Sequence, residues 1–228
     1  MLVNILCLFP EMFDALSHSV VGRAQSFGAL ELNLINIRDF ATDNYKSVDD
    51  TPYGGGAGQV MRADIIGRAV ESIEPAKRGR MIFLSPRGRT FVQSIASELA
   101  ALPAITFLCG HYEGIDERVL EYYGFEELSL GDFVLSGGEA AAIPVIDSIA
   151  RLLPGVLGNE QSLSCESFGE GLGGGLEYPQ YTRPDEWNGL KVPEVLLSGH
   201  HANIEKWRGE QSRKLTRTRR PDLTKEEC

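Results

Sequence analysis

Leu108-Cys-Gly-His-Tyr-Glu-Gly-Ile-Asp-Glu-Arg118 and Leu130-Gly-Asp-Phe-Val-Leu-Ser-Gly-Gly-Glu139 are the two stretches that decide the fold of this 228-residue chain. Each places glycines where a buried strand is expected to end. Glycine permits a positive φ and a close approach of a ligand to the main chain. One such glycine indicates only a turn, but a third stretch, Leu84-Ser-Pro-Arg-Gly88, repeats the arrangement. Because ligands bind beyond the carboxyl ends of strands in open α/β sheets, the three stretches together predict a binding site.

Apolar runs around these stretches predict an alternation of strands and helices. Strands are expected over residues 2–8, 30–37, 81–84 and 105–108. Apolar residues at helical spacing predict helices over residues 13–24, 65–73, 91–102 and 140–153. Apolar strands that alternate with helices pair in parallel and carry helices on both faces of the sheet. The predicted fold class is therefore α/β.

The character of the sequence changes after Pro154-Gly155, which ends the last of these helices. The segment that follows is rich in Ser, Glu and Gly and shows no periodicity, as is typical of a loop. We expect a sheet domain over residues 1–158, a flexible interdomain linker over 159–177 and a small helical domain over 178–228. A polar helix from about Asn203 to Arg220 is the main element expected in the small domain.

The net charge of −10 is distributed unevenly along the chain. From Lys191 onward there are nine basic and six acidic residues, so this part carries about +3 and the remainder about −13. A strongly acidic protein repels nucleic acid, whereas a local basic patch can hold phosphates. The carboxyl-terminal part is thus either an RNA-binding surface or a solvated helix face.

The amino-terminal residues predict a first strand and not a secretion signal. Met1 to Pro10 lacks a basic leader segment and a small-residue cleavage site. No stretch has the roughly 18 uninterrupted apolar residues that a membrane helix needs, so we expect a cytoplasmic protein with no membrane partner. The four cysteines, at positions 7, 109, 165 and 228, lack metal-ligand spacing. We predict neither a disulfide nor a zinc site, and no residue is assigned to a metal.

Three familiar site patterns are missing. Thr51-Pro-Tyr-Gly-Gly-Gly-Ala-Gly58 lacks the Gly-Lys-Ser/Thr ending of a phosphate-binding P-loop, so we expect a flexible loop that faces the substrate. Cys7-Leu-Phe-Pro10 stands where a Rossmann fold has its first glycines. Neither Cys165 nor His111 nor the pair His200-His201 is placed with a base and an orienting acid at interpretable spacing, so nucleophilic catalysis is not expected.

Several motifs follow one another in the order seen in a known enzyme family. They are Asp50-Thr-Pro-Tyr-Gly-Gly-Gly-Ala-Gly58, Leu84-Ser-Pro-Arg-Gly88, Gly110-His-Tyr-Glu-Gly-Ile-Asp-Glu-Arg118, Gly131-Asp-Phe-Val-Leu-Ser-Gly-Gly-Glu139, Tyr181-Thr-Arg-Pro184 and Leu197-Ser-Gly-His-His201. With them the chain closely resembles, nearly from end to end, the bacterial tRNA (guanine-N1-)-methyltransferases of the SPOUT superfamily, which modify guanine 37 beside the anticodon.

This resemblance implies a SPOUT-type parallel sheet with a deep carboxyl-terminal trefoil knot, which general topology rules do not predict. It implies S-adenosyl-L-methionine as methyl donor, tRNA with guanine at position 37 as substrate, and a homodimer whose active sites are shared between subunits. The function implied is support of reading-frame maintenance. The cofactor-binding residues implied are Leu84, Ser85, Gly110, Glu113, Leu130, Gly131, Asp132, Phe133, Val134, Leu135, Gly137, Gly138 and Pro144. Whether Mg²⁺ assists, as is reported for the family, stays open.

Methylation of guanine N1 requires two catalytic groups. N1 carries a proton at neutral pH, so a general base must remove it, and the negative charge that develops on O6 calls for a cation. The resemblance assigns the base to Glu166 and the cation to Arg151. Without it, Arg151 is a cation favoured by the dipole at a helix C-terminus, and Glu166 is a solvated linker charge.

Two departures from the family pattern bear on these assignments. Glu166 stands where the more usual motif has Asp, and a misplacement of about 1 Å can cost roughly a hundredfold in rate. Gly173-Gly-Gly175 adds length before Glu177, which would correspond to an acidic residue near the amino group of the cofactor. The alternatives are a SPOUT methyltransferase that acts on another RNA position and a non-catalytic RNA-binding relative.

Overall fold

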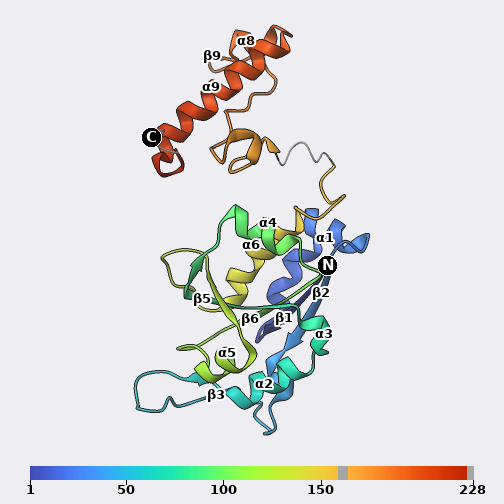
Figure 1. Ribbon diagram of the computed structural model, residues 1–228, viewed down its shortest axis with the longest axis vertical. Coiled ribbons are helices and arrows are strands. Elements are labelled where there is room, and N and C mark those ends of the chain that lie inside the picture. Colours follow the sequence, from blue (N-terminus) through green and yellow to red (C-terminus); the bar gives the residue numbers. More distant parts are fainter. Residues whose placement is uncertain (159–163, 225–228) are drawn as a thin grey trace. The chain divides into compact units, whose positions relative to one another are not determined.

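Contacts within the chain divide the computed structural model into two units, Met1–Gly158 and Asn159–Cys228 (Figure 1). The structure describes residues 1–158 and 164–224. The predicted interdomain linker begins with residues 159–163, which lie outside the described part of the chain.

The unit Met1–Gly158 is built on a parallel five-stranded sheet in the order β2-β1-β6-β5-β7. The strands are β1 (Leu2–Cys7), β2 (Glu31–Asn36), β5 (Arg80–Thr90), β6 (Ala104–Cys109) and β7 (Glu126–Ser129). Every neighbouring pair is parallel, which confirms the predicted α/β class. The sequence does not predict β7, because Glu126-Glu-Leu-Ser129 contains no apolar run and lies at the edge of the sheet.

Helices cover both faces of this sheet (Figure 1). One face carries η1 (Pro10–Ser17), α1 (Ser19–Ser26), α4 (Gln93–Ala100) and α6 (Gly138–Ala150); the other carries η2 (Ile37–Phe40), α2 (Ala63–Glu71) and α5 (Glu117–Tyr123). Successive side chains of a strand point to opposite faces, so Val3 and Ile5 of β1 join the first core whereas Leu6 joins the second. The short helix α3 (Pro75–Arg78) leads into β5.

Two helical segments differ from the sequence prediction. The helix expected over residues 13–24 is divided into η1 and α1, and Ser19 at the junction has a φ of 56°. Helix α5 is not predicted; it begins after Asp116, whose side chain accepts a hydrogen bond from the N–H of Arg118. Aspartate is a favoured N-cap for this reason. The other three expected helices of this unit are present as α2, α4 and α6.

The stretch Leu84-Ser-Pro-Arg-Gly88 lies inside β5 and not after it. Leu84 and Arg89 both pair with Leu128 of β7, so residues 85–88 form an irregularity between them. The prediction that the strand ends at Leu84 is therefore wrong, because the chain returns to the same partner strand. Gly88 permits this return, since a Cβ there would lie 2.3 Å from the backbone carbon of Glu127.

The unit Asn159–Cys228 contains a hairpin and a long helix. Strands β8 (Glu186–Trp187) and β9 (Leu190–Lys191) are joined by Asn188-Gly189, both with positive φ, as in a two-residue hairpin turn. The polar helix expected over residues 203–220 is α9 (His201–Arg219). Among the described residues, this unit also contains η3 (Glu170–Leu172), α8 (Glu194–Leu197) and η4 (Pro221–Leu223).

The described part of the predicted linker is hydrogen-bonded to α9. The N–H of Leu176 donates to Oγ1 of Thr216 at 2.9 Å, and Oγ of Ser212 donates to the carbonyl of Leu176 at 2.6 Å. Ser212 and Thr216 are buried and lie four residues apart on one face of the helix. This face of α9 is therefore occupied by residues that precede Tyr178.

Replacing Phe107 with Ala should destabilise the sheet unit by about 3–5 kcal/mol. Phe107 lies in β6 and is 0% exposed, and truncation would leave a cavity that its neighbours fill only in part. Urea unfolding followed by circular dichroism measures the change. Tyr45→Ala is the control, because Tyr45 is 92% exposed, and a surface change should alter the free energy of unfolding by less than about 0.5 kcal/mol. Equal stabilities of the two variants would contradict the central position of Phe107.

Candidate functional site

The irregular middle of β5 and the carboxyl ends of β6 and β7 border a cavity of about 380 Å³. Cavities of this size hold small molecules in many proteins. All but two of the cofactor-binding residues that the resemblance implies line this cavity. The lining ones are Leu84, Ser85, Gly110, Glu113, Leu130, Gly131, Phe133, Val134, Leu135, Gly137 and Gly138. The exceptions are Asp132 and Pro144, and Pro144 is exposed on α6.

The loop after β6 forms one wall of the cavity. Tyr112 has a φ of 59° and Gly114 a φ of 128°, so the chain turns sharply there. The N–H of Gly138, at the start of α6, donates to the carbonyl of Gly110 at 2.8 Å. The two glycine stretches of the sequence are thus in direct contact, although Gly110 and Gly138 follow different strands.

This contact depends on the missing side chains of two glycines. A Cβ on Gly138 would lie 2.6 Å from Cα of Cys109, and a Cβ on Gly137 would lie 2.3 Å from the ring of His111. Protein interiors are close-packed and do not absorb overlaps of this size without movement. The main chain itself therefore borders the cavity at Gly137 and Gly138.

The loop between β3 (Asp49–Asp50) and β4 (Val60–Met61) meets the same wall. The N–H of Glu113 donates to the carbonyl of Gln59 at 3.0 Å. Gly58 has a φ of 84°, a conformation that favours glycine, and a Cβ there would lie 2.4 Å from the Glu113 side chain. The segment predicted to face the substrate therefore ends beside the cavity.

The sequence alone does not reveal a polar pair next to the cavity. Nε2 of His111 and Oε2 of Glu139 are 2.6 Å apart, and Glu139 is fully buried. One member belongs to each glycine stretch, and they are 28 positions apart. Their presence in the two stretches was the only available signal, because neither the spacing nor the local sequence indicates a contact.

Two thiols lie at the ends of the central strands. Cys7 ends β1 and Cys109 ends β6, and both are buried. Burial, with the charge of Glu139 as a second cause, raises the pKa of Cys7 to about 12 and raises the pKa of Cys109 well above its usual value. Only the thiolate is a strong nucleophile. These two cysteines are therefore inert packing groups at neutral pH.

The two predicted catalytic residues lie in different units. Arg151 directly follows α6, is half-buried, and its N–H donates to the carbonyl of Asp147 at 3.2 Å. Glu166 is half-buried in a turn of the second unit, where its carbonyl accepts a hydrogen bond from the N–H of Gly169 at 2.9 Å. The unit that contains the cavity thus includes the predicted cation, and the predicted base belongs to the other unit.

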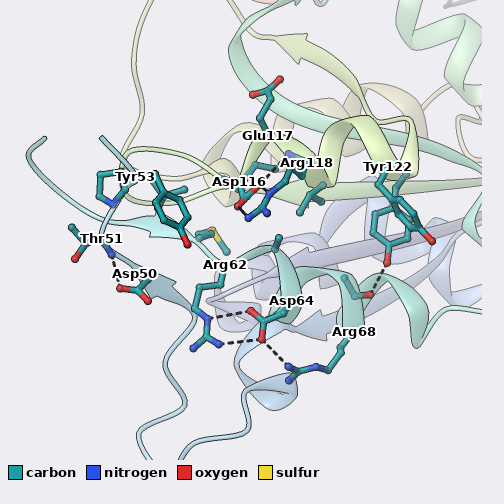
Figure 2. A pocket seen from close by; sticks show the side chains of 18 of the residues that line it. Asp50, Thr51, Tyr53, Arg62, Asp64, Arg68, Asp116, Glu117, Arg118 and Tyr122 are labelled. Atoms are coloured by element: carbon teal, nitrogen blue, oxygen red, sulfur yellow. Dashed lines mark hydrogen bonds and ion pairs between the residues drawn. The ribbon is translucent and has the colours of Figure 1, made fainter. Parts of the chain in front are cut away.

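A second, more open hollow of about 1150 Å³ lies beside α2 and α5. Figure 2 shows its ion pairs: Asp64 binds both Arg62 and Arg68, at 3.0 and 2.8 Å, and Asp116 binds Arg118 at 2.6 Å. The hydrogen bond from Arg118 lowers the pKa of the Asp116 carboxyl group. Each guanidinium is thus held in place by an aspartate.

This hollow adjoins the first cavity. Both are lined by Ile115 and Glu117. The rings of Tyr53 and Tyr122, labelled in Figure 2, also line the hollow and are 100% and 80% exposed. Exposed aromatic rings beside guanidinium groups are typical of surfaces on which nucleobases stack.

Within the described ranges 1–158 and 164–224, no three or more His, Cys, Asp or Glu side chains are grouped so that they could hold a metal ion. Likewise, none of the helices in these ranges has the length and apolar character needed to cross a bilayer.

Fold and site together define an α/β protein with a parallel sheet and a cavity of small-molecule size that is lined by glycine-rich segments. The chain belongs to the family described as tRNA (Guanine-1)-methyltransferase TrmD, which matches residues 1–226. It is similar to proteins named tRNA (guanine-N(1)-)-methyltransferase in several clostridia.

The relative in Clostridium botulinum strain Eklund 17B is 58% identical over 225 residues, covering 99% of this chain and 93% of the relative. The relative in Clostridium perfringens strain 13 is 56% identical over 223 residues, covering 98% and 93%. The relative in Clostridium tetani strain Massachusetts is 54% identical over 223 residues, covering 98% and 92%. The resemblance recognised from the motifs is confirmed.

Proposed function

We propose that this protein transfers the methyl group of S-adenosyl-L-methionine to N1 of guanine 37 in tRNA, and so supports reading-frame maintenance. The observation that carries the proposal is the cavity: residues matching the cofactor motifs of the family, far apart in sequence, line one space. The family description supports the chemistry, since it specifies a methyltransferase, tRNA and guanine-1. The identity of the methyl donor and the position of the guanine in the tRNA go beyond this description and are part of the proposal.

The residues around the cavity fit a compact, positively charged methyl donor. Leu84 and Ser85 from β5 would hold it on one side, and the segment Leu130–Leu135 on another. The Glu113 carboxylate lines the same space and complements positive charge. The bare main chain at Gly137 and Gly138 leaves room for close contacts. When bound, S-adenosyl-L-methionine supplies an electrophilic methyl group on a sulfonium.

The chain would supply the proton transfer and the charge stabilisation. Glu166 would accept the N1 proton of guanine, since N1 cannot act as a nucleophile while it is protonated. Arg151 would stabilise the negative charge that develops on O6. Arg151 lies in the unit that contains the cavity and Glu166 in the other unit.

The proposal also includes the trefoil knot in the sheet unit, a cytoplasmic homodimer and active sites shared between subunits. Exposed apolar side chains beside the cavity support the proposal that another subunit covers this surface. Phe133 is 53% exposed and Val134 is 85% exposed. Neighbouring exposed apolar groups often mark an interaction site. Sedimentation velocity of the protein tests the dimer.

Two surfaces would hold the tRNA. On α9, Arg213 and Arg217 lie four residues apart and share a face. Within the described part of the chain, neither forms an ion pair, so both are available to phosphates. In the sheet unit, the loop Pro52–Gly58 would contact the RNA near the target base, and its residues Pro52 and Tyr53 border the hollow of Figure 2.

Methyl transfer to a tRNA transcript with guanines at positions 36 and 37, with the product nucleoside identified by mass, tests this function. We expect 1-methylguanosine, and its loss when guanine 37 is replaced by adenine. Methylation that survives this replacement would instead support an enzyme acting on another RNA position. Absence of S-adenosyl-L-methionine binding in calorimetry would support a non-catalytic RNA-binding relative. Repeating the reaction with EDTA tests for assistance by Mg²⁺.

Gly138→Ala should weaken binding of S-adenosyl-L-methionine by roughly 10- to 100-fold, because a displacement of about 1 Å at a positioned site has effects of this size. The added Cβ would meet Cα of Cys109 at 2.6 Å and force the walls of the cavity apart. Gly158→Ala is the matched control, since a Cβ on Gly158 meets nothing within 4 Å. Calorimetry on both variants gives the comparison, and equal affinities would contradict the role of the Gly138 contact.

A further inference from the structure

Glu139 is a buried carboxylate for which the proposed chemistry has no use. It lies in the first turn of α6 and is 0% exposed. A buried charge is costly unless hydrogen bonds compensate it. Its Oε1 accepts hydrogen bonds from the N–H of Leu8 at 2.9 Å and of Phe9 at 3.4 Å, and its Oε2 lies 2.6 Å from Nε2 of His111. All three partners are in segments that follow the carboxyl end of a strand.

His111 is held from several sides. Its ring lies edge-on to Phe9, with 5.2 Å between the ring centroids, and its side chain is only 15% exposed. Its backbone N–H donates to Sδ of Met61 at 3.3 Å. Gly137 leaves the space that the ring occupies, since a Cβ there would overlap it. The imidazole therefore has one well-defined position, in which it meets Glu139.

The pair connects three segments around the cavity: the end of β1, the loop after β6 and the start of α6. His111 itself lines the cavity. The next residue, Tyr112, has a φ of 59°, a strained conformation for a residue with a side chain. Such a conformation persists only where the surroundings enforce it. The Glu139–His111 hydrogen bond holds the residue directly before Tyr112 and so helps to enforce this conformation.

We propose that Glu139 and His111 form a positioning pair that holds the loop Gly110–Gly114 in the shape that receives the methyl donor. The identity of that donor rests on the proposed function, but the effect on the loop does not. The pair acts through the loop and not on the reacting atoms. A hydrogen bond to a carboxylate in water-poor surroundings is strong enough for this task.

Two substitutions at His111 separate the hydrogen bond from other effects. In His111→Gln the side-chain amide places a donor near the position of Nε2, so the bond to Glu139 is kept. In His111→Asn the shorter side chain cannot reach Glu139 and leaves a buried carboxylate short of a partner. His18→Asn is the control, because His18 is exposed and its side chain makes no capping hydrogen bond.

Hydrogen exchange measures the loop without any ligand. The N–H of Glu113 donates to Gln59 and that of Gly114 donates to the carbonyl of His111, at 3.0 and 3.1 Å. We expect both amides to exchange at least about tenfold faster in His111→Asn and at an unchanged rate in His111→Gln and His18→Asn. Unchanged exchange in His111→Asn would overturn the proposal, whatever the ligand of the cavity is.

Steady-state kinetics then distinguishes positioning from general loss of stability. In His111→Asn the KM for S-adenosyl-L-methionine should rise roughly 10- to 100-fold while the KM for tRNA stays unchanged, and His111→Gln should restore most of the loss. A fall in kcat with both KM values unchanged would mean only less folded enzyme and would overturn the proposal. If the wild-type protein binds no S-adenosyl-L-methionine, the proposed function fails, and the exchange rates still decide the role of the pair.

Discussion

Glu166→Gln is expected to slow single-turnover methyl transfer to tRNA by roughly 10²- to 10⁴-fold, the range that a positioned general base contributes. The amide is nearly the same size as the carboxylate but cannot accept the N1 proton of guanine. The turn that carries Glu166 is fixed by main-chain bonds, including Phe168 N–H to Gly175 carbonyl at 2.7 Å. The substitution should therefore leave the main chain of the turn intact and remove the proposed base.

Rapid-quench assays at saturating tRNA and methyl donor measure this rate. Glu170→Gln is the matched control, because Glu170 is an exposed glutamate at the start of η3 in the same unit. Its rate should be that of the wild type. Glu166→Asp restores a carboxylate and should be faster than Glu166→Gln. An unchanged rate in Glu166→Gln would show that another group removes the proton.

Arg151→Ala should lower the single-turnover rate by roughly 10²- to 10³-fold, as expected when a group that stabilises developing negative charge is removed. Arg151 lies at the C-terminal end of α6, where a cation is also favoured by the helix dipole. The dipole effect alone would change stability by about 0.3–1 kcal/mol and leave the rate constant unaffected.

Arg23→Ala separates these two roles, because Arg23 is an exposed cation in the last turn of α1. Both variants should lose a similar, small amount of stability in urea unfolding. Only Arg151→Ala should lose activity, and Arg151→Lys should recover part of it because the positive charge is kept. Equal rates for Arg151→Ala and Arg23→Ala would reduce Arg151 to a helix-terminal cation.

Much of the sheet unit follows from local features of the sequence. Continuous apolar runs such as Ile105-Thr-Phe-Leu108 predict buried strands, and periodic apolar residues predict α2, α4 and α6. The edge strand β7 was missed because a polar edge strand has no local apolar signature. The course of β5 was mistaken because a strand can leave its neighbour and return to it, as it does around Leu84 and Arg89.

The candidate site was predictable to a similar degree. Glycines that approach other backbone atoms closely, such as Gly138, leave a sequence signal because no other residue fits. The contact between Glu139 and His111 leaves no signal beyond their presence in the two glycine stretches, since a hydrogen bond between side chains 28 positions apart depends on how the strands are ordered. The assignments of Arg151 and Glu166 came from family resemblance, because each residue taken alone is an ordinary surface charge.

By itself, then, the sequence determined the α/β class, the family and the glycine-rich walls of the cavity, because apolar periodicity and the need for glycine are local properties. Only the tertiary structure decided that the loop after β6 touches the start of α6 and that Glu139 reaches both His111 and the end of β1. These contacts arise from the strand order β2-β1-β6-β5-β7, which brings segments distant along the chain to one edge of the sheet. That order is set by packing over the whole unit, and no short stretch of residues encodes it.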